Sequence, residues 1–191
     1  MSFSGSKIPN LKICQEGPFR LEGTVFLAPW VGYASQDMRR GNITEGTDGH
    51  ITVFIGEMPE EQDDVIFVTP EQVAAYEYMV QEAKHIHDII LAHIFKYYIE
   101  SEEIQWFREG MKHFEEIYGP SNEEMEPILP DITSPEQLKS LISLGCVHFY
   151  DVDEWQSRVC YSFNSWDVEH GLSVLMLRDQ VLEIGIEAGE L

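Results

Sequence analysis

Residues 145–187 read GCVHFYDVDEWQSRVCYSFNSWDVEHGLSVLMLRDQVLEIGIE, and this stretch decides the fold. Apolar and polar side chains alternate in four short runs, which are residues 147–149, 159–163, 172–176 and 182–186. Alternation with a period of two is typical of β-strands that bury one face. Polar segments separate the runs, so the stretch predicts a four-stranded antiparallel meander. The third run is apolar on both faces except at Ser173, which predicts a central strand covered by helices.

A helical period precedes the meander. Thr69 is followed by Pro70 and, three residues after Thr69, by Gln72, which is the pattern of a capping box with proline at the first helical position. Apolar residues then recur at steps of three and four or their sum: Val73, Tyr76, Val80, Ala83, Ile90, Ile94 and Tyr98. One apolar stripe of this length predicts a single long helix over residues 70–99.

A second helix is predicted from Ser101 to the Gly119-Pro120 pair, which would end it. Its apolar residues share one face, and its charged residues lie outside that face, among them Glu102, Glu103, Glu109 and Glu116. The helical region thus covers residues 70–118. Ser134 to Gln137 repeats the capping pattern of Thr69 and predicts a short helix over residues 135–144.

Residues 11–60 contain β-branched and aromatic runs at 19–26 and 51–55, separated by loops that contain glycine. They predict two or three antiparallel strands. The whole sequence therefore predicts an α+β fold: an antiparallel sheet, made of the N-terminal strands plus the C-terminal four-stranded meander at 145–187, packed against two or three helices. At 191 residues, a single domain over 1–191 is expected.

The charge balance limits the classes of partner. The chain has 34 acidic and 12 basic residues, a net charge of −22, and residues 61–130 alone hold sixteen acids and four bases. Such a charge argues against binding to nucleic acid or to an anionic membrane, because both carry negative charge themselves. A basic protein is the partner class that it favours.

Several sequence motifs are absent, and their absence bears on cellular location and cofactors. The three cysteines form no C-x-x-C pair, and the first thirty residues show no apolar core of a signal peptide, so we expect a cytoplasmic protein. If the hairpin over 147–163 pairs, Cys146 and Cys160 come close, and we expect two buried thiols. Sequence motifs for dinucleotide, P-loop, α/β-hydrolase and zincin chemistry are absent, so no cofactor or metal is predicted.

The helical wheel separates the histidines of the long helix. His87 falls in the middle of the apolar stripe, which favours a buried, hydrogen-bonded core histidine over a ligand. His85 points to the far side together with Glu82, which predicts a solvated face rather than a metal site.

The densest constellation of chemical groups lies between the second and third runs of the meander. Asp167, Glu169 and His170 could act as acid, base or metal ligands, with His148 or Arg158 as a fourth polar group. The same segment could equally build a turn, in which Asp167 accepts backbone hydrogen bonds and Trp166 covers the core. Both interpretations stay open.

The segment WDVEHGL at 166–172 also fits a pattern, W-D/E-x-E-H-G-L, followed by an apolar strand and a charged turn. In this the chain resembles an uncharacterised family of bacterial domains of unknown function, in which the segment lies near the C-terminus. The run EGTVFLAPWVG within residues 19–32 resembles that family's N-terminal strand pair and Trp-Gly turn. The resemblance implies no catalytic residue. Some relatives look like immunity proteins of bacterial toxin systems.

Two classes of function follow. The leading hypothesis is a non-enzymatic, immunity-protein-like binding protein in the cytosol, whose acidic helical face captures a basic partner. Its binding residues would be Glu102, Glu103, Glu109 and Glu116, with the segment that contains Trp166, Asp167, Glu169 and His170 as a second binding region. The alternative is a metal-assisted or acid–base hydrolase centred on Asp167, Glu169 and His170. The acidic residues could equally serve only to keep the protein soluble. A weaker further hypothesis, mimicry of nucleic acid, requires carboxylates in regular rows.

Overall fold

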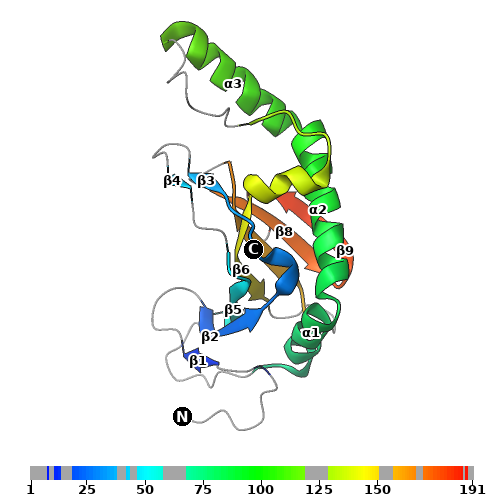
Figure 1. The fold of residues 1–191 in the computed structure, drawn as a ribbon. Coiled ribbons are helices and arrows are strands. Elements are labelled where there is room, and N and C mark those ends of the chain that lie inside the picture. Colours follow the sequence, from blue (N-terminus) through cyan, green and yellow to red (C-terminus); the bar gives the residue numbers. More distant parts are fainter. Residues whose placement is uncertain are drawn as a thin grey trace.

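The computed structural model describes residues 8, 11–13, 19–37, 42–43, 47–57, 68–118, 129–150, 157–166, 170–186 and 188. These residues form an α+β fold, as the sequence predicts, in which helices pack against a mixed β-sheet (Figure 1).

A seven-stranded sheet forms the centre of the described structure, in the spatial order β1-β2-β5-β6-β7-β8-β9. Its strands are β1 (Lys12–Ile13), β2 (Phe19–Phe26), β5 (His50–Glu57), β6 (Ser143–Phe149), β7 (Val159–Asn164), β8 (Leu172–Leu177) and β9 (Gln180–Gly185). A separate two-stranded ribbon pairs β3 (Gln36–Asp37) with β4 (Asn42–Ile43). The N-terminal strands and the C-terminal meander therefore belong to one sheet.

Three α-helices connect β5 to β6. They are α1 (Pro70–Gln81), α2 (Ala83–Glu100) and α3 (Glu102–Tyr118), and a 3₁₀ turn, η2 (Pro135–Ser140), follows them in the same connection. A second 3₁₀ turn, η1 (Ala28–Trp30), follows β2. Figure 1 shows α1 and α2 running along the sheet, whereas α3 extends beyond its end.

The start of α1 confirms the predicted capping box. The Thr69 hydroxyl accepts a hydrogen bond from the Gln72 backbone N–H at 3.2 Å, and Gln72 Oε1 accepts one from the Thr69 N–H at 3.0 Å. Two backbone donors that the first helical turn would leave unsatisfied are thereby paired.

The hydrophobic core lies between the helices and one face of the sheet. Its largest fully buried side chains include Trp30 from η1, Tyr98 from α2, Phe149 from β6 and Tyr161 from β7. Because successive side chains of a strand point to opposite faces, the other face carries the intervening residues, among them Cys146, His148, Cys160 and Ser162.

The predicted single helix over residues 70–99 is two helices. Glu82 breaks it with φ −102° and ψ 20°, so α1 ends at Gln81 and α2 begins at Ala83. Within the last turn of α1 the buried position belongs to Met79, while Val80, which belongs to the predicted stripe, is 42% exposed.

The sequence predicted a purely antiparallel sheet, and this prediction is wrong at one pair of strands. β5 and β6 run parallel, with Val53 opposite Val147. A hairpin joins only antiparallel strands, but the three helices between β5 and β6 form a connection long enough to return to the same end of the sheet.

The region around η2 also differs from the prediction. The predicted helix over 135–144 is a 3₁₀ turn that ends at Ser140, and β6 begins at Ser143, because Ser143 and Leu144 pair with β7. The predicted central strand, β8, pairs on both sides but lies second from the edge of the sheet.

β9 contains a register shift that the period-two pattern did not predict. Leu175 lies opposite Glu183 and Met176 opposite Val181, so Leu182 is the extra residue of a bulge. Leu182 is therefore 42% exposed, and Val181 takes the inward position that the alternation assigned to Leu182.

Candidate functional site

α3 presents an acidic outer face. Glu102, Glu109 and Glu116 are spaced by seven residues, so they follow one stripe of the helix, and all three are exposed. Trp106 is four residues from Glu102 and three from Glu109, which places it beside both on the helix surface. Its indole is 74% exposed, and Ile117 is 58% exposed. This face, from here on the α3 outer face, combines carboxylates with a large apolar side chain in solvent.

The first turn of α3 is anchored to the rest of the molecule. Ile104 is buried, and the Arg108 guanidinium lies over the Tyr98 ring, 4.9 Å from its centroid. The Tyr98 hydroxyl donates to the Pro130 carbonyl at 2.7 Å, and burial raises the pKa of this hydroxyl. Glu103, the fourth predicted acid of α3, accepts a hydrogen bond from the Tyr97 hydroxyl. Glu103 thus lies at the junction with α2, apart from the stripe.

Most basic residues in 61–130 form ion pairs with carboxylates outside the α3 outer face. Residues 61–130 contain four basic residues, and three of them form ion pairs within the described part of the chain: Lys84 with Asp88, Lys96 with Glu100, and Arg108 with Asp131. On the stripe, the described contact is between Glu116 and His113 Nδ1 at 4.0 Å. These three bases therefore compensate other carboxylates than those of the α3 outer face, whereas the fourth, Lys112, is exposed on α3 and lies beside Glu109 and Glu116 by its spacing.

The segment around Trp166 is described in part. Trp166 is buried, and its ring packs edge-on against Tyr98 at a centroid distance of 5.0 Å. Gly171 has φ +72°, and a Cβ there would lie 2.7 Å from the Phe163 carbonyl oxygen, so the position requires glycine. These two observations agree with the turn interpretation. His170 is exposed, whereas Asp167 and Glu169 lie outside the described residues. The binding role of this segment stays a prediction.

His87 is the buried, hydrogen-bonded core histidine that the helical wheel predicts. Its Nε2 is 2.9 Å from the Tyr33 hydroxyl, and its Nδ1 is 3.0 Å from Asp88 Oδ1. The Trp30 ring packs edge-on against the imidazole at 4.6 Å. Burial lowers the pKa of His87, and burial raises the pKa of Tyr33 to about 12. Tyr33 and His87 are buried in the core, whereas Asp88 is exposed, so neither the hydroxyl nor the imidazole lies at the surface. Glu82 and His85 are exposed, also as predicted.

The two cysteines of the β6–β7 hairpin are free thiols. Cys146 Sγ is 2.9 Å from His148 Nε2, and His148 lies opposite Cys160 across the pair of strands. Burial raises the pKa of Cys146 to about 11 and lowers that of His148 to about 4. Thiol and imidazole are both neutral at pH 7, which is the wrong state for a nucleophilic thiolate–imidazolium pair.

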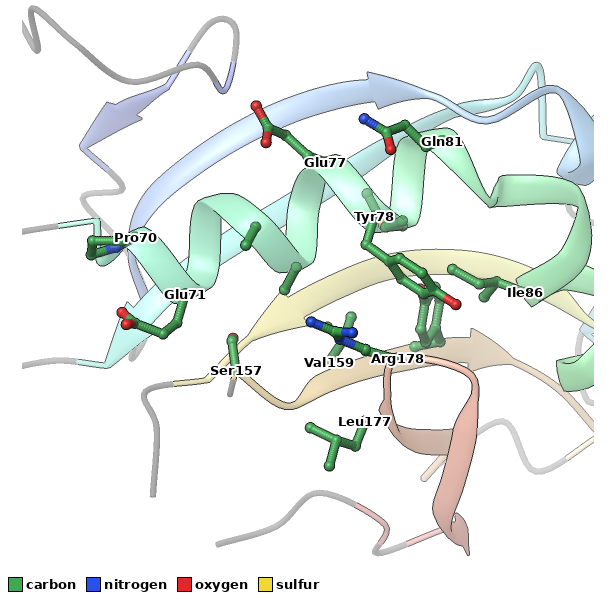
Figure 2. Close-up of a pocket in the computed structure, with 14 residues that line it drawn as sticks. Pro70, Glu71, Glu77, Tyr78, Gln81, Ile86, Ser157, Val159, Leu177 and Arg178 are labelled. Carbon is green, nitrogen blue, oxygen red and sulfur yellow. The ribbon is translucent and has the colours of Figure 1, made fainter. Parts of the chain in front are cut away.

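A cavity of about 380 Å³ lies between α1 and the strands β7 and β8 (Figure 2). Met79, Ile86, Val159 and Leu177 are among the apolar residues that line it. Tyr161 also lines it and is 2% exposed, and no described residue hydrogen-bonds to its hydroxyl. Burial raises the pKa of this hydroxyl, so it stays a neutral donor.

Arg178 is the cation of the cavity. It lies in the two-residue turn between β8 and β9 with φ 55°, a conformation that side chains other than glycine rarely adopt. Its guanidinium carbon is 5.9 Å from the centroid of the Tyr78 ring. Figure 2 shows the guanidinium beneath α1, near Ser157 and Val159, whereas Glu77 and Gln81 project from the other side of the helix. Within the described residues, Arg178 forms no salt bridge.

Sequence reasoning missed Trp106 and the cavity. A signal for Trp106 was available, since a tryptophan outside the apolar stripe of an amphipathic helix has no core to enter. The sequence singled out Arg178 less clearly: it is one of three basic residues in 131–191, and it lies in a short turn between two predicted strands. No local pattern marked Tyr161, which the alternation of its strand assigns to the core.

The described residues contain neither a metal-binding cluster nor a membrane-spanning helix. No group of three or more His, Cys, Asp or Glu there could hold a metal ion, although Asp167 and Glu169 are not among them. None of the described helices is long and apolar enough to cross a bilayer.

One protein-family model matches most of the chain. The profile described as Domain of unknown function (DUF6985) matches residues 31–191. The match includes every helix and strand from β3 to β9, the α3 outer face and the cavity, whereas β1, β2 and η1 precede it. No curated protein and no solved structure matches the chain. Because the profile covers well over half of the sequence, the chain belongs to the DUF6985 family of domains of unknown function.

Proposed function

We propose that this protein is a non-enzymatic binding protein that captures a basic protein partner on the α3 outer face. One observation carries the proposal: Trp106 is 74% exposed between the exposed carboxylates of Glu102 and Glu109. Tryptophan is among the residues that most often dominate the energy of protein interfaces.

The electrostatics of the molecule support a cationic partner. The stripe of Glu102, Glu109 and Glu116 belongs to a chain of net charge −22, so its field attracts basic surfaces from a distance. Long-range attraction raises association rates, whereas a buried indole slows dissociation. The carboxylates would therefore steer the partner, and Trp106 would hold it.

Some relatives of the uncharacterised family that the Trp166 to Leu172 segment resembles look like immunity proteins, which makes a basic bacterial toxin domain the first partner class to test. We propose that the encounter takes place in the cytosol, since the free thiols Cys146 and Cys160 fit a reducing compartment.

The proposal can be tested by capture at low salt followed by kinetics with the purified partner. We expect the association rate constant to fall about tenfold or more as salt is raised, because salt screens exposed charges. Replacing Glu102, Glu109 and Glu116 together by glutamine should slow association. Trp106→Ala should mainly accelerate dissociation and cost about 2 kcal/mol or more of binding free energy.

The matched control replaces three exposed acids elsewhere, Glu82→Gln, Asp179→Asn and Glu183→Gln, which changes the net charge equally. This variant should bind nearly as the wild type does. If both triple variants slow association to the same extent and Trp106→Ala has no effect, capture reflects bulk charge alone and the α3 outer face is not the interface.

A further inference from the structure

The cavity beneath α1 combines features that are independent of the α3 outer face. Its walls are apolar and polar in about equal measure, and it contains one guanidinium without a salt bridge among the described residues and one buried hydroxyl without a hydrogen bond there. A volume of about 380 Å³ is at the lower end of the range for small-molecule sites. Pockets with apolar walls and a few convergent polar groups are where small ligands bind.

The unpaired guanidinium defines the charge of a ligand. Arg178 is exposed and forms no salt bridge within the described residues, so its guanidinium is available to a ligand that enters the cavity from solvent. Arginine binds carboxylates through two parallel N–H donors, and charge-assisted hydrogen bonds of this kind are stronger than neutral ones. Glu71 and Glu77 also line the cavity, so a monoanion suits the single guanidinium better than a phosphate or a dicarboxylate.

The spacing of the two polar groups defines the length of a ligand. Val159 lies opposite Met176, and Arg178 follows Met176 by two residues, so the backbone of Arg178 is level with position 157 of the neighbouring strand. Tyr161 is four residues from that level, which corresponds to roughly 13 Å along a strand. The side chains of Arg178 and Tyr161 both extend into the cavity, so the distance between the guanidinium and the hydroxyl is shorter than the distance between the two backbones. It is about the length of an arylpropanoic acid.

We propose that the cavity binds a small monocarboxylic acid with an aromatic or aliphatic body and a second hydrogen-bonding group. The carboxylate binds the Arg178 guanidinium, the body packs against Met79, Ile86 and Val159, and the second polar group bonds with the Tyr161 hydroxyl. Tyr78, whose ring already lies beside Arg178, covers the ligand. This binding activity does not depend on the proposed capture of a basic protein.

The test uses three defined probes and isothermal titration calorimetry with the full chain. They are para-hydroxyphenylpropionate, its neutral amide, and phenylpropionate, which lacks the hydroxyl. We expect saturable binding of the first probe, with the amide weaker by about tenfold or more and phenylpropionate weaker by about two- to tenfold.

Variants assign each difference to a residue. Arg178→Gln should abolish the difference between acid and amide, and Tyr161→Phe should abolish the difference between the hydroxylated and unhydroxylated acids. Ala75→Leu, which adds volume to the cavity wall on a helix that tolerates leucine, should block all three probes. Lys96→Gln removes a positive charge outside the cavity and should leave binding unchanged.

Near-ultraviolet circular dichroism establishes that each variant is folded before titration. The proposal is overturned if the wild type binds none of the probes saturably, if acid and amide bind equally, or if folded Ala75→Leu binds as the wild type does.

Discussion

His148 shows what burial does to a single titratable side chain. Its imidazole packs between Phe54 and Tyr150 on the outer face of the sheet, at ring distances of 5.1 and 6.3 Å, and contacts the Cys146 thiol. Burial penalises the charged form, so the pKa falls from its ordinary value of 6.5 to about 4. The folded protein therefore keeps this histidine neutral at pH values where the unfolded chain protonates it.

The consequence is a loss of stability at acid pH. Between pH 6.5 and about 4 the unfolded state binds a proton that the folded state does not, so the free energy of unfolding falls as pH falls. From pH 7 to about pH 5, this one group should cost about 2 kcal/mol. His148→Phe removes that contribution. Between pH 7 and about pH 5, its free energy of unfolding, measured with urea, should therefore fall by about 2 kcal/mol less than that of the wild type.

The control for the pH experiment is the exposed His85 of α2, which lies on another element than His148. His85→Gln should follow the wild-type pH dependence. Parallel curves for the wild type and His148→Phe would show that His148 titrates normally in the folded protein.

The start of α1 is the element that shapes the cavity. Pro70, Glu71, Ala74 and Ala75 all belong to its first two turns and line the space. The orientation of these turns depends on the Thr69–Gln72 capping box, and Gln72 is completely buried beneath them. The capping box at the start of α1 thus supports the wall of the cavity.

Removing the capping hydroxyl should destabilise α1 and the protein with it. Thr69→Ala should lower the free energy of unfolding by about 1 kcal/mol, because the Gln72 N–H loses its acceptor. Chemical denaturation measures this change. Thr69→Ser keeps the hydroxyl and should retain most of the stability, so equal losses in the two variants would contradict a capping role.

The charge of the whole molecule opposes its compact state. With a net charge of −22, carboxylates repel one another across the surface, and the ion pairs of Lys84, Lys96 and Arg108 relieve this only locally. Exposed pairs of this kind contribute little individually. Stability should therefore depend on the ionic strength of the solution.

We expect the melting temperature to rise by a few degrees as salt is increased from about 0.01 M to about 0.5 M, because added ions screen the repulsion. The variant with glutamine at positions 102, 109 and 116 has less charge to screen and should show a smaller rise. Differential scanning calorimetry measures both. A melting temperature independent of salt would contradict the proposed net repulsion.

Much of the fold was predictable because the signals act within a few residues. Thr69, Pro70 and Gln72 specify a helix start through their own hydrogen bonds and backbone restriction. The alternation around Tyr161 and Val174 specifies strands with one buried face, and His87 lies in the core as its position in the apolar stripe requires. The candidate site was predictable in part: the acids of α3 were identified, but neither Trp106 nor the cavity was.

Local patterns in this chain determine which segments become helices and strands, since propensity and periodicity are properties of neighbouring residues. The folded structure alone settles the parallel pairing of β5 with β6, the break at Glu82, the bulge at Leu182 and the position of Arg178 near Tyr161. Each of these depends on packing between residues far apart in the chain. A cavity depends on such packing most of all, because it forms only where several distant elements meet without filling the space between them.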